Sequence, residues 1–214
     1  MKKIIILTLT LISALFFLPK EEAYADEMNE VMEANNIVVE EKGEFRAAWL
    51  SHYIGSMSSY TNEETFKTQA NQVLDILEYY NFNAMIIHFR THNNALYKSS
   101  LNPKANWFGT VNFDEFDPLE WAIEETHKRG IEFHAWLNPY RISTTGAQTQ
   151  YVSGSIPAVN PVNDSSNLLQ SGNSIILNPG LQSNRDFIVD SCMEVVENYD
   201  VDAIHFDDYF YISG

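Results

Sequence analysis

Hydrophobic residues from position 45 onward follow two spacings, a period of two in short runs and a period of three to four in longer segments. Four short runs predict β-strands: FRAAWLS at 45–51, AMIIHFR at 84–90, IEFHAWLN at 131–138 and AIHFDDYF at 203–210. Three longer segments predict helices between these strands: 61–80, 117–130 and 183–199. The resulting βαβαβαβ order favours a parallel sheet with helical crossovers.

Capping residues mark the boundaries of two of these helices. Thr61 and Glu64 form a capping-box pattern at the start of the first helix. Asp117 followed by Pro118 predicts the start of the second helix, and Gly130 predicts its end. The residues expected to face the core are Phe66, Ala70, Val73, Leu74 and Leu77 on the first helix, and Phe187, Ile188, Val195 and Val196 on the third.

Two parallel architectures fit this order, an open doubly wound sheet and a barrel. The strands of an open sheet are buried on both faces and read as continuous aliphatic runs. Here polar residues take every second position, as His88 and Arg90 do in one strand and His134 and Asn138 do in another. One face then packs on helices while the other directs polar groups into a shared interior. This arrangement favours a TIM barrel with its active site at the carboxyl ends of the strands.

The predicted fold class is therefore α/β, with about the first four β/α units of a (β/α)8 TIM barrel in residues 45–214. A complete barrel of this type has eight strands, so we expect the second half to follow Gly214. A half-barrel that pairs with a second copy of the chain is the alternative. No glycine-rich phosphate loop follows the first predicted strand, which disfavours nucleotide binding, and we predict no cofactor.

The amino terminus is typical of an export signal. A basic start and an apolar run at 4–18 precede small residues at Ala23 and Ala25, which predicts a cleavable signal peptide over 1–25. The run is shorter than the roughly 20 residues of a membrane span, which disfavours an uncleaved anchor. We therefore expect a secreted or cell-wall-associated protein, with residues 26–44 as an acidic linker.

The composition narrows the range of partners. A formal net charge of −16 repels nucleic acid and anionic membranes, so we predict neither as a partner, and no stable membrane insertion after signal cleavage. Cys192 is the single cysteine, so it cannot form a disulfide within the chain. It lies among apolar residues of a predicted helix, where packing is the expected role.

Two aspartates end the fourth predicted strand. Adjacent strand residues point to opposite faces, and the alternation favours Asp207 as the inward group, although a bulge would favour Asp208. A carboxylate near positive charge stays ionised, which suits a nucleophile or a stabiliser of an oxocarbenium ion. The predicted neighbours at the strand ends are Arg90, His134 and Asn138. A structural aspartate that pairs with Arg90 or caps a helix is the alternative.

Histidines recur in the polar phase of three strands, at His88, His134 and His205. They could act with Asp207 as metal ligands, but close spacings such as His-x-His are missing from the sequence. We therefore predict barrel-lining side chains that hold substrate hydroxyl groups, and no metal.

A long connection, 139–182, follows the third predicted strand and is rich in amides and turn residues. Loops of this length are usually functional, although a disordered or decorative insertion is the alternative. Tyr151 in this loop, with Trp107 and Phe108 after the second strand, could provide flat surfaces for sugar rings. The predicted substrate-binding residues are Arg90, His134, Trp136, Asn138, Tyr140, Arg141, His205 and Tyr209.

Five stretches of the chain match the motifs of a known family: FRAAWLS from Phe45, HFRTHNNALYKSS from His88, DPLEWAIEETHKRGIEFHAWLNPYR from Asp117, ILNPG from Ile176 and YDVDAIHFDDYFY from Tyr199. Together they resemble the glycosyl hydrolase-like 10 family of bacterial exported proteins, distant relatives of the α-amylase-type barrels. Thr91 and Asn94 depart from the family pattern, in which proline and an acidic residue are usual.

The resemblance implies a TIM-barrel glycoside hydrolase that acts on a bacterial polysaccharide such as the glycan strands of peptidoglycan. It also implies that the nucleophile is Asp207 or Asp208 and that the acid/base carboxylate lies beyond Gly214. Two other functions stay open: a glycan-binding module without catalysis, and a metal-dependent deacetylase or amidohydrolase that uses the histidines.

Overall fold

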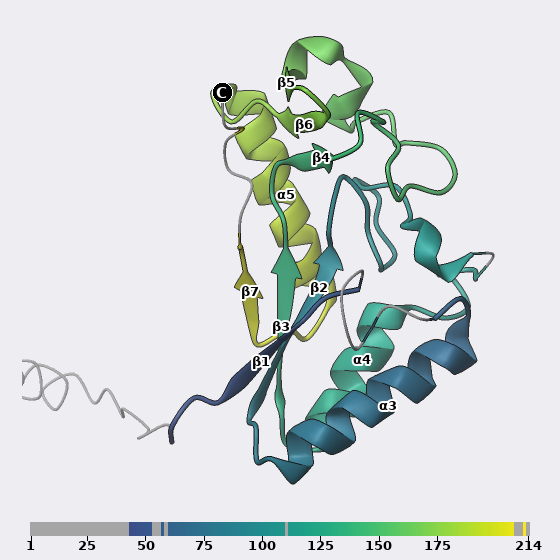
Figure 1. Ribbon diagram of the computed structural model, residues 1–214, viewed down its shortest axis with the longest axis vertical. Coiled ribbons are helices and arrows are strands. Elements are labelled where there is room, and N and C mark those ends of the chain that lie inside the picture. The colour runs from purple at the N-terminus through teal and green to yellow at the C-terminus, as the bar shows by residue number, and fades with distance from the viewer. Residues whose placement is uncertain (1–42, 53–56, 58–59, 110, 208–211, 213–214) are drawn as a thin grey trace, which may run out of the picture. The chain divides into compact units, whose positions relative to one another are not determined.

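The computed structural model describes residues 43–52, 57, 60–109, 111–207 and 212 (Figure 1). The predicted signal peptide, most of the predicted linker, Asp208 and Tyr209 lie outside these residues. Among the described helices, none is both long and apolar enough to cross a membrane.

The main sheet has four parallel strands in the order β1-β2-β3-β7 (Figure 1). The strands are β1 (Ala47–Leu50), β2 (Ala84–Arg90), β3 (Glu132–Leu137) and β7 (Ala203–His205). The four strands match the four predicted runs, and each pairs in parallel with the next of these runs along the chain. The predicted parallel sheet with helical crossovers is therefore confirmed. Closure into a barrel stays a prediction.

The first of the described α-helices, α3 (Glu63–Tyr79), buries all five residues expected to face the core. Its cap differs from the predicted one by a single residue. Asn62 is the N-cap, and its side chain accepts a hydrogen bond from the backbone N–H of Thr65 at 2.9 Å. The Thr65 hydroxyl accepts in turn from the Asn62 backbone, so these two residues form the capping box instead of Thr61 and Glu64.

Two further α-helices in the described part of the chain are α4 (Pro118–His127) and α5 (Gln182–Asn198). The Asp117 carboxylate accepts from the Leu119 backbone N–H at 2.9 Å, which confirms the predicted cap of α4. Gly130 has φ +69°, the left-handed conformation expected just after this helix. Three of the four residues expected to face the core on α5 are buried, but Val196 is exposed because it lies about 100° around the helix from Val195.

The two faces of the sheet differ in character. One face packs against the helices with Leu50, Met85, Ile87, Phe89, Phe133, Ala135 and Leu137. Across the other face, one row of paired residues is Trp49, Ile86, His134 and Ala203, and the next is His88, Trp136 and His205. We call these two rows the inner face. Burial of each large side chain on the helix face stabilises the fold by about 1.5–3 kcal/mol.

The predicted long loop contains a second, antiparallel sheet of order β4-β6-β5 (Figure 1). Its strands are β4 (Arg141–Ser143), β5 (Leu168–Ser171) and β6 (Ser174–Leu177). A separate apolar cluster, Ile142, Val162, Ile175, Leu177, Phe187 and Ile188, packs this sheet against α5. The segment is therefore ordered, and the alternative of a disordered insertion is wrong. The choice between a functional and a decorative insertion stays a prediction.

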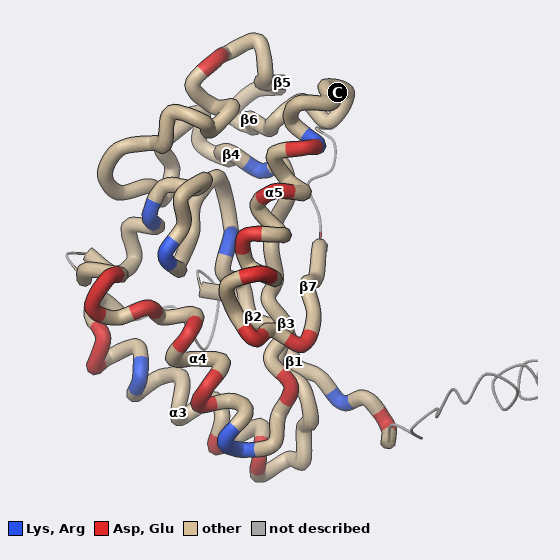
Figure 2. Tube along the Cα trace, turned by 180° about the vertical axis from the view of Figure 1, so that it is seen from behind, with Lys and Arg blue, Asp and Glu red and all other residues tan. Residues whose placement is uncertain are grey.

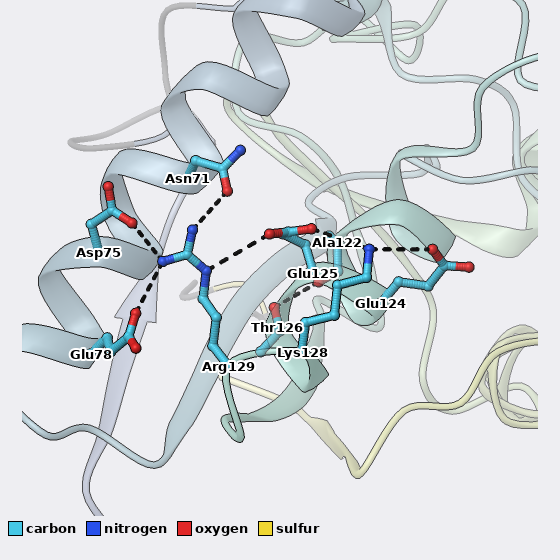
Figure 3. A network of polar contacts seen from close by, with 9 residues as sticks. All are labelled: Asn71, Asp75, Glu78, Ala122, Glu124, Glu125, Thr126, Lys128 and Arg129. Carbon is cyan, nitrogen blue, oxygen red and sulfur yellow. Dashed lines mark hydrogen bonds and ion pairs between the residues drawn. The ribbon is translucent and has the colours of Figure 1, made fainter.

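Acidic residues are distributed along α3, α4 and α5 (Figure 2). One basic side chain, Arg129, links the end of α4 to α3 (Figure 3). Its guanidinium contacts Asp75 at 2.5 Å, Glu78 at 3.3 Å and the Asn71 amide oxygen at 2.9 Å. These contacts bridge α3 and the end of α4 at the protein surface.

Candidate active site

Aromatic and imidazole rings gather on the inner face near the carboxyl ends of the strands. The His88 ring stacks on Trp136, with ring centroids 3.8 Å apart and an interplanar angle of 4°. Trp49 meets Trp136 edge-on at 4.9 Å. The Trp136 indole N–H donates to the side-chain oxygen of Asn138 at 3.2 Å. The rings are therefore held in a fixed arrangement at the edge where barrel enzymes carry their active sites.

Three histidines near these strand ends are neutral. Burial lowers the pKa of His52 to about 3, and its Nδ1 lies 2.5 Å from the Tyr60 hydroxyl oxygen. Burial, followed by the positive charge of Arg141, lowers the pKa of His92 to about 3. The pKa of His88 is well below its usual value, mainly through burial and then through the neighbouring His52, Arg141 and His92. At neutral pH these rings act as hydrogen-bonding groups rather than as acids.

Arg141, the first residue of β4, is the cation beside these rings. It is 5% exposed, so its charge lies in a region of low dielectric and acts strongly on nearby groups. Tyr140, the preceding residue, is half-buried and packs against the apolar cluster of the second sheet. Tyr140 and Arg141 were both predicted to bind substrate. Of the two, Arg141 acts on the imidazoles, since its charge helps to lower the pKa of His88 and of His92.

Arg90 does not share the inner face with His88, so this part of the prediction is wrong. A bulge separates the two residues, because His88 pairs with Trp136 whereas Arg90 pairs with Leu137. The bulge turns Arg90 to the helix side, where it is 1% exposed. Its guanidinium donates to the backbone oxygens of Asn138 and Pro139 and, at 3.0 Å, to the side-chain oxygen of Asn102. Arg90 therefore secures the turn between β3 and β4.

Asn138 contributes to the same turn, since its amide donates to the backbone oxygen of Thr91 at 3.2 Å. The end of β3 and the end of β2 are thereby held together by side chains predicted to bind substrate.

Asp207 lies two residues after His205, just past the end of β7, and is exposed. The preceding residue, Phe206, lines a small crevice on the helix side together with Arg90, Leu137 and Cys192. Cys192 is half-buried there, in keeping with the packing role expected for it. The second aspartate, Asp208, and Tyr209 are outside the described residues.

His134 and His205 contact each other, with Nδ1 of His134 2.8 Å from Nε2 of His205. Within the described residues, no group of three or more His, Cys, Asp or Glu side chains could hold a metal ion. His88 stacks on Trp136 in the next row of the inner face.

A second aromatic pair lies beside the strand ends. The Tyr151 ring stacks on Trp107, with centroids 5.0 Å apart and an interplanar angle of 22°, and meets His92 edge-on at 4.9 Å. Tyr151 has φ +59°, a conformation that side-chain-bearing residues rarely adopt and that is common at functional sites. Phe108, by contrast, is fully buried in the core, so its predicted role as a sugar-stacking wall is wrong.

Asn94 explains how this strained conformation is held. Its side-chain oxygen accepts from the backbone N–H groups of Thr91 and His92, at 3.2 and 3.1 Å. Its amide nitrogen donates to the backbone oxygen of Tyr151 at 2.9 Å. An ionised acidic residue at this position could accept but could not donate, so the departure from the family pattern fits the contact with Tyr151.

The hydrophobic pattern did not single out His52, His92 or Glu132. His52 follows the first predicted strand by one residue, and His92 lies in the predicted loop. Glu132 lies two residues before His134 in the predicted strand, at a polar position, but its contact with His134, at 3.0 Å, depends on the side-chain rotamers. Proximity to the carboxyl end of a strand was the available indication for the two histidines.

A large groove of about 940 Å³ lies away from the strand ends, between the start of α4 and α5. Two of its carboxylates are bound to hydroxyl groups of the protein: Glu194 accepts from Ser99 and Ser100, and Asp117 accepts from Tyr199. The groove is lined mainly by acidic and small polar residues, whereas rings and a buried cation gather at the strand ends, so we place the candidate site on the inner face.

Comparisons with known proteins show what this chain is similar to. Residues 44–214 match the model of the family described as glycosyl hydrolase-like 10. Glycosyl hydrolase YngK of Bacillus subtilis (strain 168) is 36% identical over 174 residues, which cover 78% of this chain and 33% of that protein. Glycosyl hydrolase DigH of Escherichia coli (strain K12) is 33% identical over 148 residues, which cover 66% of this chain and 34% of that protein. The chain thus spans about a third of the length of these curated relatives.

Among solved structures, a GH36 α-galactosidase AgaA from Geobacillus stearothermophilus, crystallised with stachyose, is similar with a TM-score of 0.46 and 12% sequence identity. The alignment covers 76% of this chain and 21% of that chain.

Proposed function

Since the chain belongs to the glycosyl hydrolase-like 10 family, we propose that it is the first part of a (β/α)8 barrel that hydrolyses O-glycosidic bonds. The proposed substrate is a bacterial polysaccharide outside the cytoplasm, such as the glycan strands of peptidoglycan. The export signal predicted over residues 1–25 and the acidic charge support a secreted or cell-wall-associated protein.

The observation that carries the proposal is the group of rings and one cation at the carboxyl ends of the strands. Trp49 is 50% exposed and offers flat apolar surface, and it rests edge-on against the buried Trp136 ring. The Trp136 ring is in turn held by its stack on His88 and by the hydrogen bond from its indole N–H to Asn138. Arg141 adds a buried positive charge close to the imidazoles. Sugars present both apolar ring faces and hydroxyl groups, so a site of this composition matches them on both counts.

In the proposed mechanism Asp207 is the nucleophile. Its carboxylate would attack the anomeric carbon while a second carboxylic acid protonates the departing glycosidic oxygen. Water would then hydrolyse the covalent glycosyl intermediate, with the second carboxylate acting as base. Retaining enzymes hold the two carboxyl groups about 5–5.5 Å apart, and we propose that the partner belongs to a later strand of the complete protein.

The complete protein, incubated with purified peptidoglycan glycan strands, is expected to release new reducing ends over time. A soluble α-glucan serves as the control substrate, because it lacks the N-acetylated sugars of the cell wall. Binding to glycan strands without cleavage would instead support the glycan-binding module. Release of acetate from uncut strands, lost with a chelator and restored by zinc, would support the metal-dependent deacetylase.

The aromatic pair is expected to contribute to substrate binding. In Tyr151→Ala the stacking surface on Trp107 is lost, so we expect KM for glycan strands to rise roughly tenfold, equivalent to about 1.4 kcal/mol, with kcat little changed. Tyr79→Ala is the matched control, because Tyr79 is 80% exposed at the end of α3. An unchanged KM in Tyr151→Ala would exclude this ring from the binding surface.

A further inference from the structure

Three side chains on the inner face form a continuous hydrogen-bonded chain. Glu132 Oε2 lies 3.0 Å from His134 Nε2, and His134 Nδ1 lies 2.8 Å from His205 Nε2. Glu132 and His134 are two residues apart on β3, so they share one face of that strand. His134 pairs with Ala203 in the sheet register, which makes His205 its diagonal neighbour on β7. The chain therefore runs along the inner face toward the carboxyl end of β7.

Hydrogen-bonding rules determine where the protons lie when both imidazoles are neutral. An ionised carboxylate can only accept, so the proton of His134 must be on Nε2, facing Glu132. Nδ1 of His134 is then unprotonated and accepts from His205, which must carry its own proton on Nε2. Nδ1 of His205 is left as an unprotonated acceptor.

Aromatic neighbours hold the two imidazole rings in place. Phe45 stacks on the His134 ring with centroids 5.5 Å apart, and Trp49 meets the His205 ring edge-on at 5.4 Å. His134 is 6% exposed. Burial, followed by the neighbouring His134, lowers the pKa of His205.

We propose that Glu132 and His134 are positioning residues that fix the tautomer of His205, so that His205 presents Nδ1 as a hydrogen-bond acceptor. His205 lies two residues before Asp207 on the same strand. An acceptor at this position can bind the hydrogen of a substrate hydroxyl group, but it cannot donate to the Asp207 carboxylate and so leaves the nucleophile's charge undiminished. The contact with substrate rests on the proposed function, whereas the proton arrangement does not.

The proton arrangement is tested directly by nuclear magnetic resonance on the complete protein labelled with ¹⁵N-histidine. Long-range ¹H–¹⁵N correlations distinguish a ring protonated on Nε2 from one protonated on Nδ1. At neutral pH we expect His134 and His205 both to be protonated on Nε2 alone, with their signals assigned from His134→Asn and His205→Asn. Protonation of either ring on Nδ1 in the unaltered protein would overturn the proposal without requiring any variant to fold.

Transmission along the chain is tested with Glu132→Gln. A neutral amide can donate as well as accept, so it permits both tautomers of His134. His205 is bonded to His134 and not to Glu132 in this chain of hydrogen bonds. We nevertheless expect the ¹⁵N chemical shifts of its two ring nitrogens to move toward each other, because both tautomers become populated. Glu120→Gln, an exposed carboxylate on α4, is the matched control and should leave His205 unchanged. Unchanged His205 signals in a folded Glu132→Gln would overturn the proposal.

The link to catalysis has a separate readout. We expect Glu132→Gln to raise KM for glycan strands about fivefold with kcat nearly unchanged, as for the weakening of one hydrogen bond. An unaltered KM together with shifted His205 signals would show that His205 does not contact substrate. It would still support the hydrogen-bonded chain from Glu132 through His134 to His205. A complete protein that cleaves no glycan would overturn the proposed function, while the resonance experiment would still decide the tautomers.

Discussion

Asp207→Asn is expected to lower kcat for glycan cleavage by about four orders of magnitude, as removal of a catalytic nucleophile does. The amide has nearly the same shape as the carboxylate but cannot form the glycosyl intermediate. Because Asp207 is exposed just beyond β7, the substitution should leave the fold and the free energy of unfolding unchanged within about 0.5 kcal/mol. The measurement is the initial rate of reducing-end release at saturating glycan.

Asp208→Asn provides the comparison that identifies the nucleophile. Alternation along the strand predicts that Asp208 points away from the inner face, so we expect its loss of kcat to stay within about tenfold, below the loss for a nucleophile. Asp200→Asn, whose side chain is 96% exposed, is the control for the loss of one surface charge. A large loss in Asp208→Asn alone would transfer the role to Asp208. Full activity in both variants would rule out a nucleophile at the end of β7.

Arg90→Met is expected to reduce the free energy of unfolding by about 3–5 kcal/mol, at the large end of single substitutions. Methionine fills part of the space but donates no hydrogen bond. The buried backbone oxygens of Asn138 and Pro139 and the amide oxygen of Asn102 would each lose a donor. Urea denaturation followed by tryptophan fluorescence measures the loss as a lower midpoint with an unchanged slope.

The matched control is Arg185→Met. Arg185 also donates to a proline carbonyl, the Pro179 oxygen at 2.6 Å, but it is only half-buried. Water can replace this donor, so we expect a loss of about 1 kcal/mol or less. Equal losses in the two variants would show that burial of Arg90 adds nothing. Arg90→Lys should fall between them, because one ammonium cannot reach all three acceptors.

The helix and strand positions were largely predictable because local physical chemistry specifies them. Phe66, Val73 and Leu77 repeat at helical spacing and are buried, whatever they pack against. Asp117 caps α4 through bonds to backbone groups two and three residues away, so its role is contained in the local sequence. Gly130 ends the same helix for an equally local reason, its tolerance of positive φ.

The small second sheet was not predictable because its strands have only three or four residues each and lie in a segment rich in amides and turn residues, whereas β1 and β7 belong to longer runs of alternating residues. Runs this short give too few alternations for a period to be recognised. They are stabilised by packing of Ile142, Ile175 and Leu177 against Phe187 of α5, a contact between segments distant in sequence. Similarly, Asn62 rather than Thr61 caps α3, a difference that depends on the backbone conformation before the helix.

The sequence alone thus determined the parallel βα order, the polar alternation of the strands and the position of Asp207 at the end of the fourth one. Only the tertiary structure decided which of the polar residues face one another. Alternation assigned Arg90 to the inner face, yet a bulge after His88 turned it to the helix side, because register depends on the backbone of the neighbouring strand. The hydrogen-bonded chain from Glu132 through His134 to His205 depends on the diagonal offset between β3 and β7. The alternation within one strand does not specify this offset.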